Sequence, residues 1–204
     1  MINWEKWHKK DKIEKIPKNY FLMELLRKHL PKKGSCIELG CSPGRMMSAM
    51  AKNFNYRFSG IDITALDTTK KNLEHNNIRN VKLIKGNITS YRPNQKYDIV
   101  CSFGLIEHFK NSKEAFKHFD KFCRKGGYMV IGLPNFRYLF KAVHFLFGRS
   151  IYHNPEIMDL SEIRKITKDY ETIYLGYYPK LFKFNLLIKS KFTAPYIIYI
   201  GRKV

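Results

Sequence analysis

The stretch Cys36–Arg45, "CIELGCSPGR", runs from apolar residues typical of a buried strand, through the acid Glu38, to two glycines, Gly40 and Gly44. Glycines after a strand predict a tight turn whose backbone a ligand can approach closely. The spacing E-x-G-x-x-x-G differs from the dinucleotide-binding G-x-G-x-x-G pattern and has no P-loop lysine. A second acid, Asp62, ends the next apolar run, where a carboxylate can accept hydrogen bonds from ribose hydroxyls.

Apolar runs alternate with helical patterns around this stretch, which indicates an α/β fold with a parallel sheet. The predicted strands cover 35–40, 56–63, 81–88, 97–104, 127–135, 171–179 and 195–204. The predicted helices cover 20–30, 44–53, 64–76, 111–124 and 161–169. The helix 111–124 opens at Asn111-Ser112, which is expected to supply the N-cap, and ends where Gly126 or Gly127 supplies a left-handed turn. The strands are uniformly apolar, so we expect helices on both faces, a doubly wound sheet, and a ligand crevice at the carboxyl ends of the first strands.

Composition fits a soluble globular chain: of 204 residues, 44% are hydrophobic and 27% charged. We expect one domain over 1–204, with an N-terminal helical cap at 1–33 and substrate-side insertions at 136–170 and 180–192. No apolar run approaches the roughly 20 residues of a membrane-spanning helix, and the N-terminus has no signal-peptide core. The four cysteines have no metal-binding spacing, which favours reduced thiols, a cytoplasmic location and no metal.

Five segments in order resemble the motifs of one enzyme family: "CIELGCSPG" (36–44), "GIDIT" (60–64), "KGNI" (85–88), "YDIVCSFGLIEHF" (97–109) and "RKGGYMVIGLPN" (124–135). The family is the class I S-adenosylmethionine-dependent methyltransferases, particularly the small-molecule branch called methyltransferase type 11 or 12. The resemblance covers residues 20–135. It implies a Rossmann-like seven-stranded sheet, mostly parallel with an antiparallel last strand. It also implies S-adenosylmethionine as methyl donor, S-adenosylhomocysteine as product and no metal.

The resemblance implies cofactor-binding roles for Glu38, Gly40, Cys41, Gly44, Asp62, Ile63, Asn87, Ile88, Ser102 and Phe103. In this scheme the loop after the first strand lines the methionine end of the cofactor, and Glu38 orders that loop. Asp62 takes the ribose hydroxyls, Ile63 packs on adenine, and Asn87 and Ile88 lie at the adenine edge. The sequence departs from the family at Asn87, where an aspartate is commoner.

Two residues after the fourth strand are candidates for catalysis, His108 and the adjacent Glu107. Methyl transfer depends mainly on placing donor and acceptor in contact with water excluded. A base is needed when the acceptor is a hydroxyl or a protonated amine. His108 is therefore either that base or a wall of the pocket.

The acceptor pocket is expected to involve Tyr20 on one side and Tyr152 and His153 on the other. The favoured acceptor is a small molecule methylated on O, N or C, such as a sugar or a lipid-linked intermediate. Segments 136–148 and 180–192 mix large apolar residues with basic ones. This composition is typical of segments that contact an anionic membrane surface. The alternative is that both segments pack on the sheet and cover the acceptor pocket.

Two other functions stay open. The net charge of +21 suggests an RNA methyltransferase. Compositional bias in the source genome would also explain this charge. The fourth-strand motif lacks the aspartate of ribosomal RNA 2′-O-methyltransferases, which argues against that class. The third hypothesis is a non-catalytic methyltransferase-like binding subunit.

Overall fold

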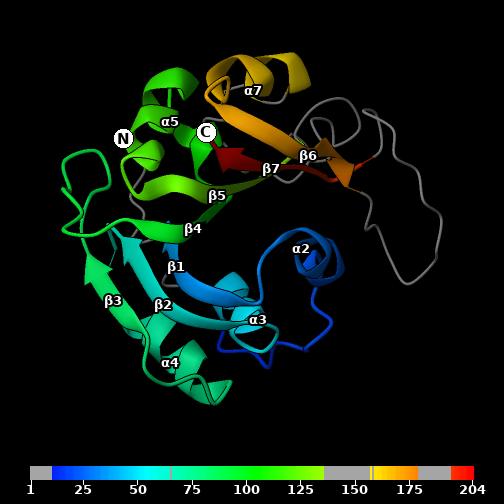
Figure 1. The fold of residues 1–204 in the computed structure, drawn as a ribbon. Helices are drawn as coiled ribbons and strands as arrows, with labels where there is room; N and C mark the ends of the chain where they lie inside the picture. The colour runs from blue at the N-terminus through cyan, green and yellow to red at the C-terminus, as the bar shows by residue number, and fades with distance from the viewer. Residues whose placement is uncertain (1–10, 65, 136–156, 158, 179–193) are drawn as a thin grey trace, which may run out of the picture.

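The computed structural model describes residues 11–64, 66–135, 157, 159–178 and 194–204 (Figure 1). Its strands form one seven-stranded sheet in the order β3-β2-β1-β4-β5-β7-β6. The strands are β1 (Lys33–Leu39), β2 (Asn55–Asp62), β3 (Lys82–Lys85), β4 (Tyr97–Phe103), β5 (Cys123–Pro134), β6 (Tyr170–Tyr178) and β7 (Tyr196–Lys203). Strand β7 pairs antiparallel with β5 and with β6, whereas the pairs among β1 to β5 are parallel. The predicted sheet, including its antiparallel last strand, is confirmed.

Helices cover both faces of the sheet, as expected for a doubly wound fold (Figure 1). The helices are α2 (Met23–His29), α3 (Arg45–Ala51), α4 (Asp67–His75), the 3₁₀ turn η1 (Ile106–His108), α5 (Ser112–Asp120) and α7 (Leu160–Ile166). The buried hydrophobic residues of α2, α3 and α4 belong to one hydrophobic cluster, and those of η1, α5 and α7 belong to the other. The sheet lies between the two clusters. Strands β2 and β3 lie on one side of β1, and β4 and β5 lie on its other side, so the strand order switches direction between β1 and β4. In doubly wound sheets a ligand crevice forms at the carboxyl ends of the strands at such a switch point.

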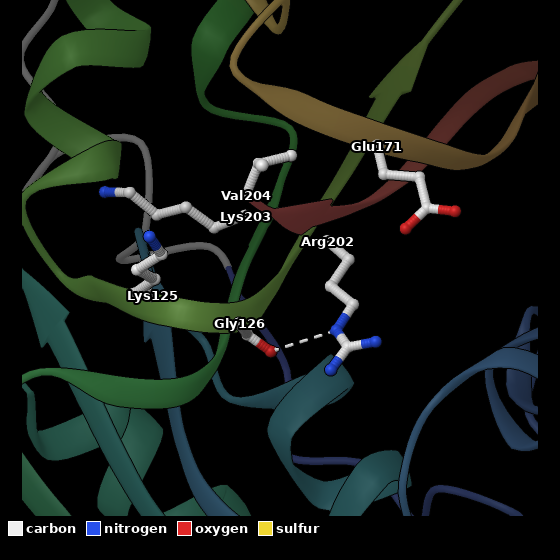
Figure 2. A pocket seen from close by; sticks show the side chains of 6 residues that line it. All are labelled: Lys125, Gly126, Glu171, Arg202, Lys203 and Val204. Carbon is white, nitrogen blue, oxygen red and sulfur yellow. Dashed lines mark hydrogen bonds between the residues drawn. The ribbon is translucent and has the colours of Figure 1, made fainter.

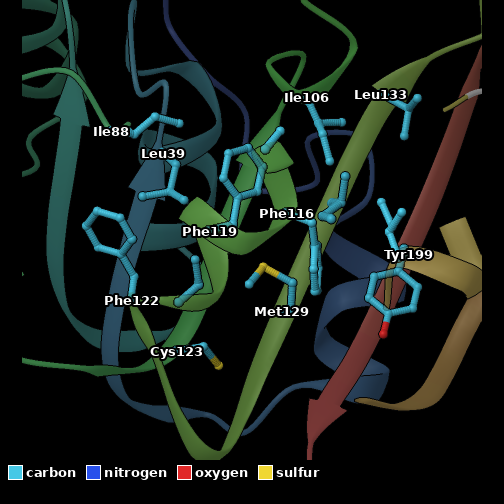
Figure 3. Packing of buried hydrophobic residues seen from close by; sticks show 14 of the residues in the cluster. Leu39, Ile88, Ile106, Phe116, Phe119, Phe122, Cys123, Met129, Leu133 and Tyr199 are labelled. Carbon is cyan, nitrogen blue, oxygen red and sulfur yellow. The ribbon is translucent and has the colours of Figure 1, made fainter. Parts of the chain in front are cut away.

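Helix α5 is positioned by its N-cap and by its apolar face. The Asn111 Oδ1 atom accepts a hydrogen bond of 3.0 Å from the backbone N–H of Glu114, which confirms the predicted cap. Figure 3 shows Phe116 and Phe119 of this helix packed in the cluster with Met129 of β5 and Tyr199 of β7. This packing fixes the segment that connects β4 to β5.

The predicted end of this helix is wrong. Helix α5 stops at Asp120, and β5 already begins at Cys123, because Phe122 and Cys123 are fully buried in the core. Gly126 has a positive φ of 70°, but it lies within β5, close to where the register with β4 shifts. The glycine therefore serves a strand irregularity and not the end of a helix.

Strand β3 is shorter than predicted, ending at Lys85. The chain then turns at Asn87, whose Oδ1 accepts hydrogen bonds from the backbone N–H and the hydroxyl of Thr89, at 3.0 and 2.9 Å. This side-chain turn competes with the strand ladder and ends it.

Candidate functional site

The loop between β1 and α3 is shaped by its glycines. Gly40 and Gly44 have φ values of 73° and 89°, a conformation that residues with a side chain rarely adopt. A Cβ atom at Gly40 would also lie 3.0 Å from the Leu105 side chain, which would have to shift to accommodate it. The N–H groups of Gly40 and Cys41 donate to the Ile61 carbonyl at 2.9 and 3.3 Å, which holds the loop against the end of β2.

Asp62 ties the end of β2 to the same loop. One carboxylate oxygen accepts from the Ser42 N–H at 3.0 Å, and the other accepts from the N–H and hydroxyl of Thr64 at 2.9 and 2.8 Å. A carboxylate has about four lone-pair sites, so Asp62 retains capacity for a further donor such as a ribose hydroxyl. The next side chain, Ile63, is 50% exposed and offers an apolar surface beside that carboxylate.

The acid that precedes the loop, Glu38, is buried, and its Oε2 atom has no hydrogen-bond partner among the described residues. Burial raises the pKa of this carboxyl well above its usual range, and the nearby charge of Asp62 adds to the shift. Burial likewise raises the pKa of the Cys41 thiol. A raised pKa disfavours the thiolate, which is the nucleophilic form of a cysteine.

The sheet register brings the predicted residues of β1 and β4 together. Leu39 lies opposite Ser102, whose hydroxyl donates to the Leu39 carbonyl at 3.1 Å. The next residue, Phe103, ends β4, and a Cβ atom at Gly132 would lie 2.6 Å from its ring. Gly132 thus makes room for an aromatic ring at the carboxyl edge of the sheet.

The adenine-edge candidates are placed less favourably. Ile88 is buried in a hydrophobic cluster, whereas Asn87 is exposed. The side-chain oxygen of Asn87 is engaged with Thr89, so an adenine amino group would have to share it.

Glu107 and His108 follow β4 in η1. Glu107 is 1% exposed, its Oε2 has no hydrogen-bond partner among the described residues, and burial raises its pKa to about 8. The Nε2 atom of His108 lies 3.9 Å from the Oε1 atom of Glu107. A carboxyl group with such a pKa can exchange a proton near neutral pH.

Tyr20 lies at the same edge of the sheet. Its ring is 5.0 Å from that of Phe21, which is 4.9 Å from Tyr196 at the first position of β7. Because β7 is antiparallel, Tyr196 pairs with Pro134 at the carboxyl end of β5. Phe21 and Tyr196 were not predicted as site residues. For Tyr196 a signal exists in the sequence, because an aromatic residue that begins an antiparallel strand beside β5 lies at the carboxyl end of β5. The other acceptor-side candidates, Tyr152 and His153, lie outside the described residues.

Two hollows lie at the opposite edge of the sheet. One, of about 340 Å³, is lined by Lys125, Gly126, Glu171, Arg202, Lys203 and Val204 (Figure 2). The other, of about 500 Å³, lies at the start of β1 and β2, beside Lys33 and Arg57. Neither hollow includes a residue of the predicted site.

The described residues contain neither a metal-binding cluster nor a membrane-spanning helix. No group of three or more His, Cys, Asp or Glu side chains there could hold a metal ion. No helix within these residues has the length and apolar character needed to cross a membrane.

Comparison with known proteins identifies a family model described as a methyltransferase domain, which matches residues 13–171. A relative, malonyl-[acyl-carrier protein] O-methyltransferase 2 of Ilyobacter polytropus, is 23% identical over 146 residues, covering 65% of this chain and 52% of the relative. Another, the mitochondrial ubiquinone biosynthesis O-methyltransferase of Dictyostelium discoideum, is 26% identical over 62% of this chain and 41% of its own length. The chain thus matches about half or less of the length of these relatives.

Solved structures share the fold. The PH0226 protein of Pyrococcus horikoshii superposes with a TM-score of 0.69, at 14% identity, over 98% of this chain and 99% of that chain. The N-methyltransferase NodS of Bradyrhizobium japonicum, in complex with S-adenosylhomocysteine, gives a TM-score of 0.61 at 12% identity over 98% and 93% of the two chains.

Proposed function

The chain belongs to the methyltransferase domain family, and on that premise we propose that it is an S-adenosylmethionine-dependent methyltransferase acting on a small-molecule acceptor. The observation that carries this proposal is the arrangement at the ends of β1 and β2. A glycine loop with positive φ values is held against the Asp62 carboxylate, and the exposed Ile63 side chain follows. At this one edge of the sheet, a ligand can approach the loop backbone closely, a carboxylate can accept from ribose hydroxyls, and an apolar side chain can pack against adenine.

The residues of this edge have distinct proposed roles. Gly40, Cys41 and Gly44 line the methionine end of S-adenosylmethionine, and Asp62 accepts from the ribose hydroxyls. Ile63 packs on adenine, with Asn87 and Ile88 at its edge, and Ser102 and Phe103 lie beneath the sulfonium. Glu38, buried directly before the loop, maintains the loop's position.

In the reaction, the acceptor atom attacks the methyl carbon in line, the carbon–sulfur bond breaks, and S-adenosylhomocysteine leaves. The sulfonium loses its positive charge as the carbon–sulfur bond breaks, so the leaving group is neutral, and correct placement and exclusion of water supply most of the acceleration. His108 is the proposed base for an acceptor hydroxyl or ammonium. The adjacent Glu107, whose Oε1 lies 3.9 Å from His108 Nε2, has its pKa raised to about 8 and can accept a proton only where it is ionised.

The proposed acceptor is a small molecule, with a sugar or a lipid-linked intermediate as the examples. The relatives named above are O-methyltransferases, and coclaurine N-methyltransferase of Papaver somniferum is 25% identical over 48% of this chain, so both O and N acceptors are represented. Tyr20, Phe21 and Tyr196 provide aromatic surface at the acceptor side.

A nucleic-acid partner is the second candidate, and one observation favours it. Exposed basic side chains line the edge of the sheet opposite the proposed cofactor site: Lys32, Lys33, Arg57, Lys82, Lys96, Lys125 and Arg202. The acid Asp98 at this edge is engaged by Arg124, at 2.6 Å. A row of cations on adjacent strands suits the phosphates of a nucleic acid. The segments that motivated membrane contact, 136–148 and 180–192, lie outside the described residues.

The proposal is tested by titrating the wild-type protein and Asp62→Ala with S-adenosylhomocysteine in a calorimeter. Loss of the ribose hydrogen bonds should weaken binding by about 1–3 kcal/mol. The matched control is Asp67→Ala, which removes an exposed carboxylate five positions away, at the start of α4, and should leave the affinity unchanged. Equal affinity of wild type and a folded Asp62→Ala variant would remove Asp62 from the site. Binding without turnover of any acceptor would favour a non-catalytic binding subunit.

A further inference from the structure

The described N-terminal segment, residues 11–16, is held by two asparagine side chains of α4 and its C-cap. Asn72 Oδ1 accepts from the Glu14 N–H at 3.0 Å, and Asn76 Oδ1 accepts from the Ile16 N–H at 2.8 Å. The Asn76 amide also donates to the Glu14 carbonyl at 2.9 Å. Because the two asparagines are four positions apart, they lie one turn apart on the same face of the helix. Together they bind the backbone of this segment as a neighbouring strand would.

Asn72 also reaches the proposed cofactor loop. Its Nδ2 atom donates to the Pro43 carbonyl at 2.9 Å, while its Oδ1 atom holds Glu14. The side chain is 1% exposed, so both hydrogen bonds are protected from water, and losing either leaves a buried polar group unpaired. A single amide therefore joins a segment at the start of the described chain to the loop between β1 and α3.

A second contact links the same two regions. Arg45, the first residue of α3 after the loop, forms an ion pair with Glu14 and another with Asp11, the latter at 3.7 Å. On the other side, Ile16 is 2% exposed and packs in the cluster formed with α2 and α3. The segment is thus attached at the loop by polar contacts and to the core by an apolar one.

Resting on the proposed function, we propose that Asn72 is a positioning residue that couples cofactor binding to ordering of segment 11–16. When the cofactor loop is fixed by its ligand, Pro43 holds the Asn72 amide in the orientation that binds Glu14. In the reverse direction, a docked segment fixes the amide and with it the loop. Such coupling is reciprocal, so each event strengthens the other by the same factor.

The first test uses the wild-type protein. Amide hydrogen exchange at Glu14 and Ile16, measured by NMR with and without saturating S-adenosylhomocysteine, should slow on binding by about five-fold or more, the lower end of ordinary coupling. Binding that leaves both exchange rates unchanged would overturn this inference while the proposed function stands. If the wild-type protein does not bind S-adenosylhomocysteine, the proposed function fails and this inference with it.

The second test compares Asn72→Asp with Asn76→Asp by calorimetry. In Asn72→Asp, an oxygen still accepts from Glu14, but the donor to Pro43 is gone, so affinity for S-adenosylhomocysteine should fall about ten-fold. Asn76→Asp introduces the same charge, and its carboxylate would still accept from Ile16, but it loses the donor to the Glu14 carbonyl while the Asn72–Pro43 hydrogen bond is kept. Docking of the segment is then weakened at one point only, so affinity should fall by less than in Asn72→Asp, by about two-fold. Equal losses in the two variants, or no loss in Asn72→Asp, would overturn the inference; if Asn72→Asp does not fold, the exchange measurement alone decides.

Discussion

At the scale of single residues, the carboxyl groups near the proposed site differ in how they are satisfied. Asp62 accepts three hydrogen bonds, from Ser42 and Thr64. Glu38 and Glu107 are buried, and each has an oxygen without a partner among the described residues. Burial therefore favours the protonated form of both glutamates.

The raised pKa of Glu107 predicts a pH dependence of stability. Its pKa rises from 4.5 to about 8 on folding, so between these values the folded state binds a proton that the unfolded state has released. The free energy of unfolding should therefore fall as the pH rises, by at most about 1.4 kcal/mol per pH unit from this group. Urea denaturation of wild type and Glu107→Gln at about pH 5.5 and about pH 7.5 measures this contribution. Wild type should lose more stability than the variant across this interval, and equal losses would contradict the raised pKa.

At the scale of elements, β2 and α3 approach each other closely at Gly60. A Cβ atom there would lie 2.5 Å from the Met47 side chain and 2.8 Å from the Cys41 sulfur. Cys41 belongs to the cofactor loop, so this close approach connects the sheet, the helix and the loop. A larger residue at position 60 would push the loop away from the end of β2.

Gly60→Ala should accordingly lower the free energy of unfolding by about 1–3 kcal/mol through overpacking. Gly86→Ala is the matched control, because the Cβ atom there would meet its nearest neighbours at an ordinary 3.5 Å. Urea denaturation of both variants measures the difference. A Gly60→Ala variant as stable as Gly86→Ala would show that α3 shifts without cost.

Several elements could be predicted from the sequence because their residues carry local signals. The Asn111 cap, the glycine loop and the apolar strands are of this kind, and they were confirmed. The end of α5 was not predictable in this way. Phe122 and Cys123 continue a helical pattern in the sequence, but both are buried in the core, and Cys123 begins β5 and pairs with Tyr97 of β4. The link from Asn72 to Glu14 and Pro43 joins residues far apart in the chain, and no local pattern indicates it.

At the scale of the whole molecule, the two edges of the sheet differ in character. The carboxyl ends of β1, β2 and β4 carry the glycine loop, Asp62 and Glu107, whereas exposed lysines and arginines line the opposite edge. The hollow between Lys125 and Arg202 lies on that basic edge (Figure 2). A nucleic acid held there would lie away from the proposed site of methyl transfer.

This basic edge predicts localised, salt-dependent binding of a polyanion. One variant changes four exposed basic residues of the edge to Gln: Lys32, Lys33, Arg57 and Lys82. The control changes four exposed lysines on helices, which removes the same charge: Lys28, Lys70, Lys113 and Lys165. Affinity for a fluorescent single-stranded RNA should fall in the first variant, and the logarithmic salt slope should decrease by about 0.7 for each phosphate that the protein no longer neutralises. Equal effects in both variants would show that the charge acts diffusely.

The most direct test of the central claim is a crystal structure of the protein grown with saturating S-adenosylhomocysteine. The ligand should lie at the carboxyl ends of β1 and β2, with a ribose hydroxyl within hydrogen-bond distance of Asp62 and the adenine against Ile63. Its methionine end should follow the backbone of Gly40–Gly44. A structure without the ligand at this edge, or with the ligand in a hollow at the opposite edge, would contradict the account.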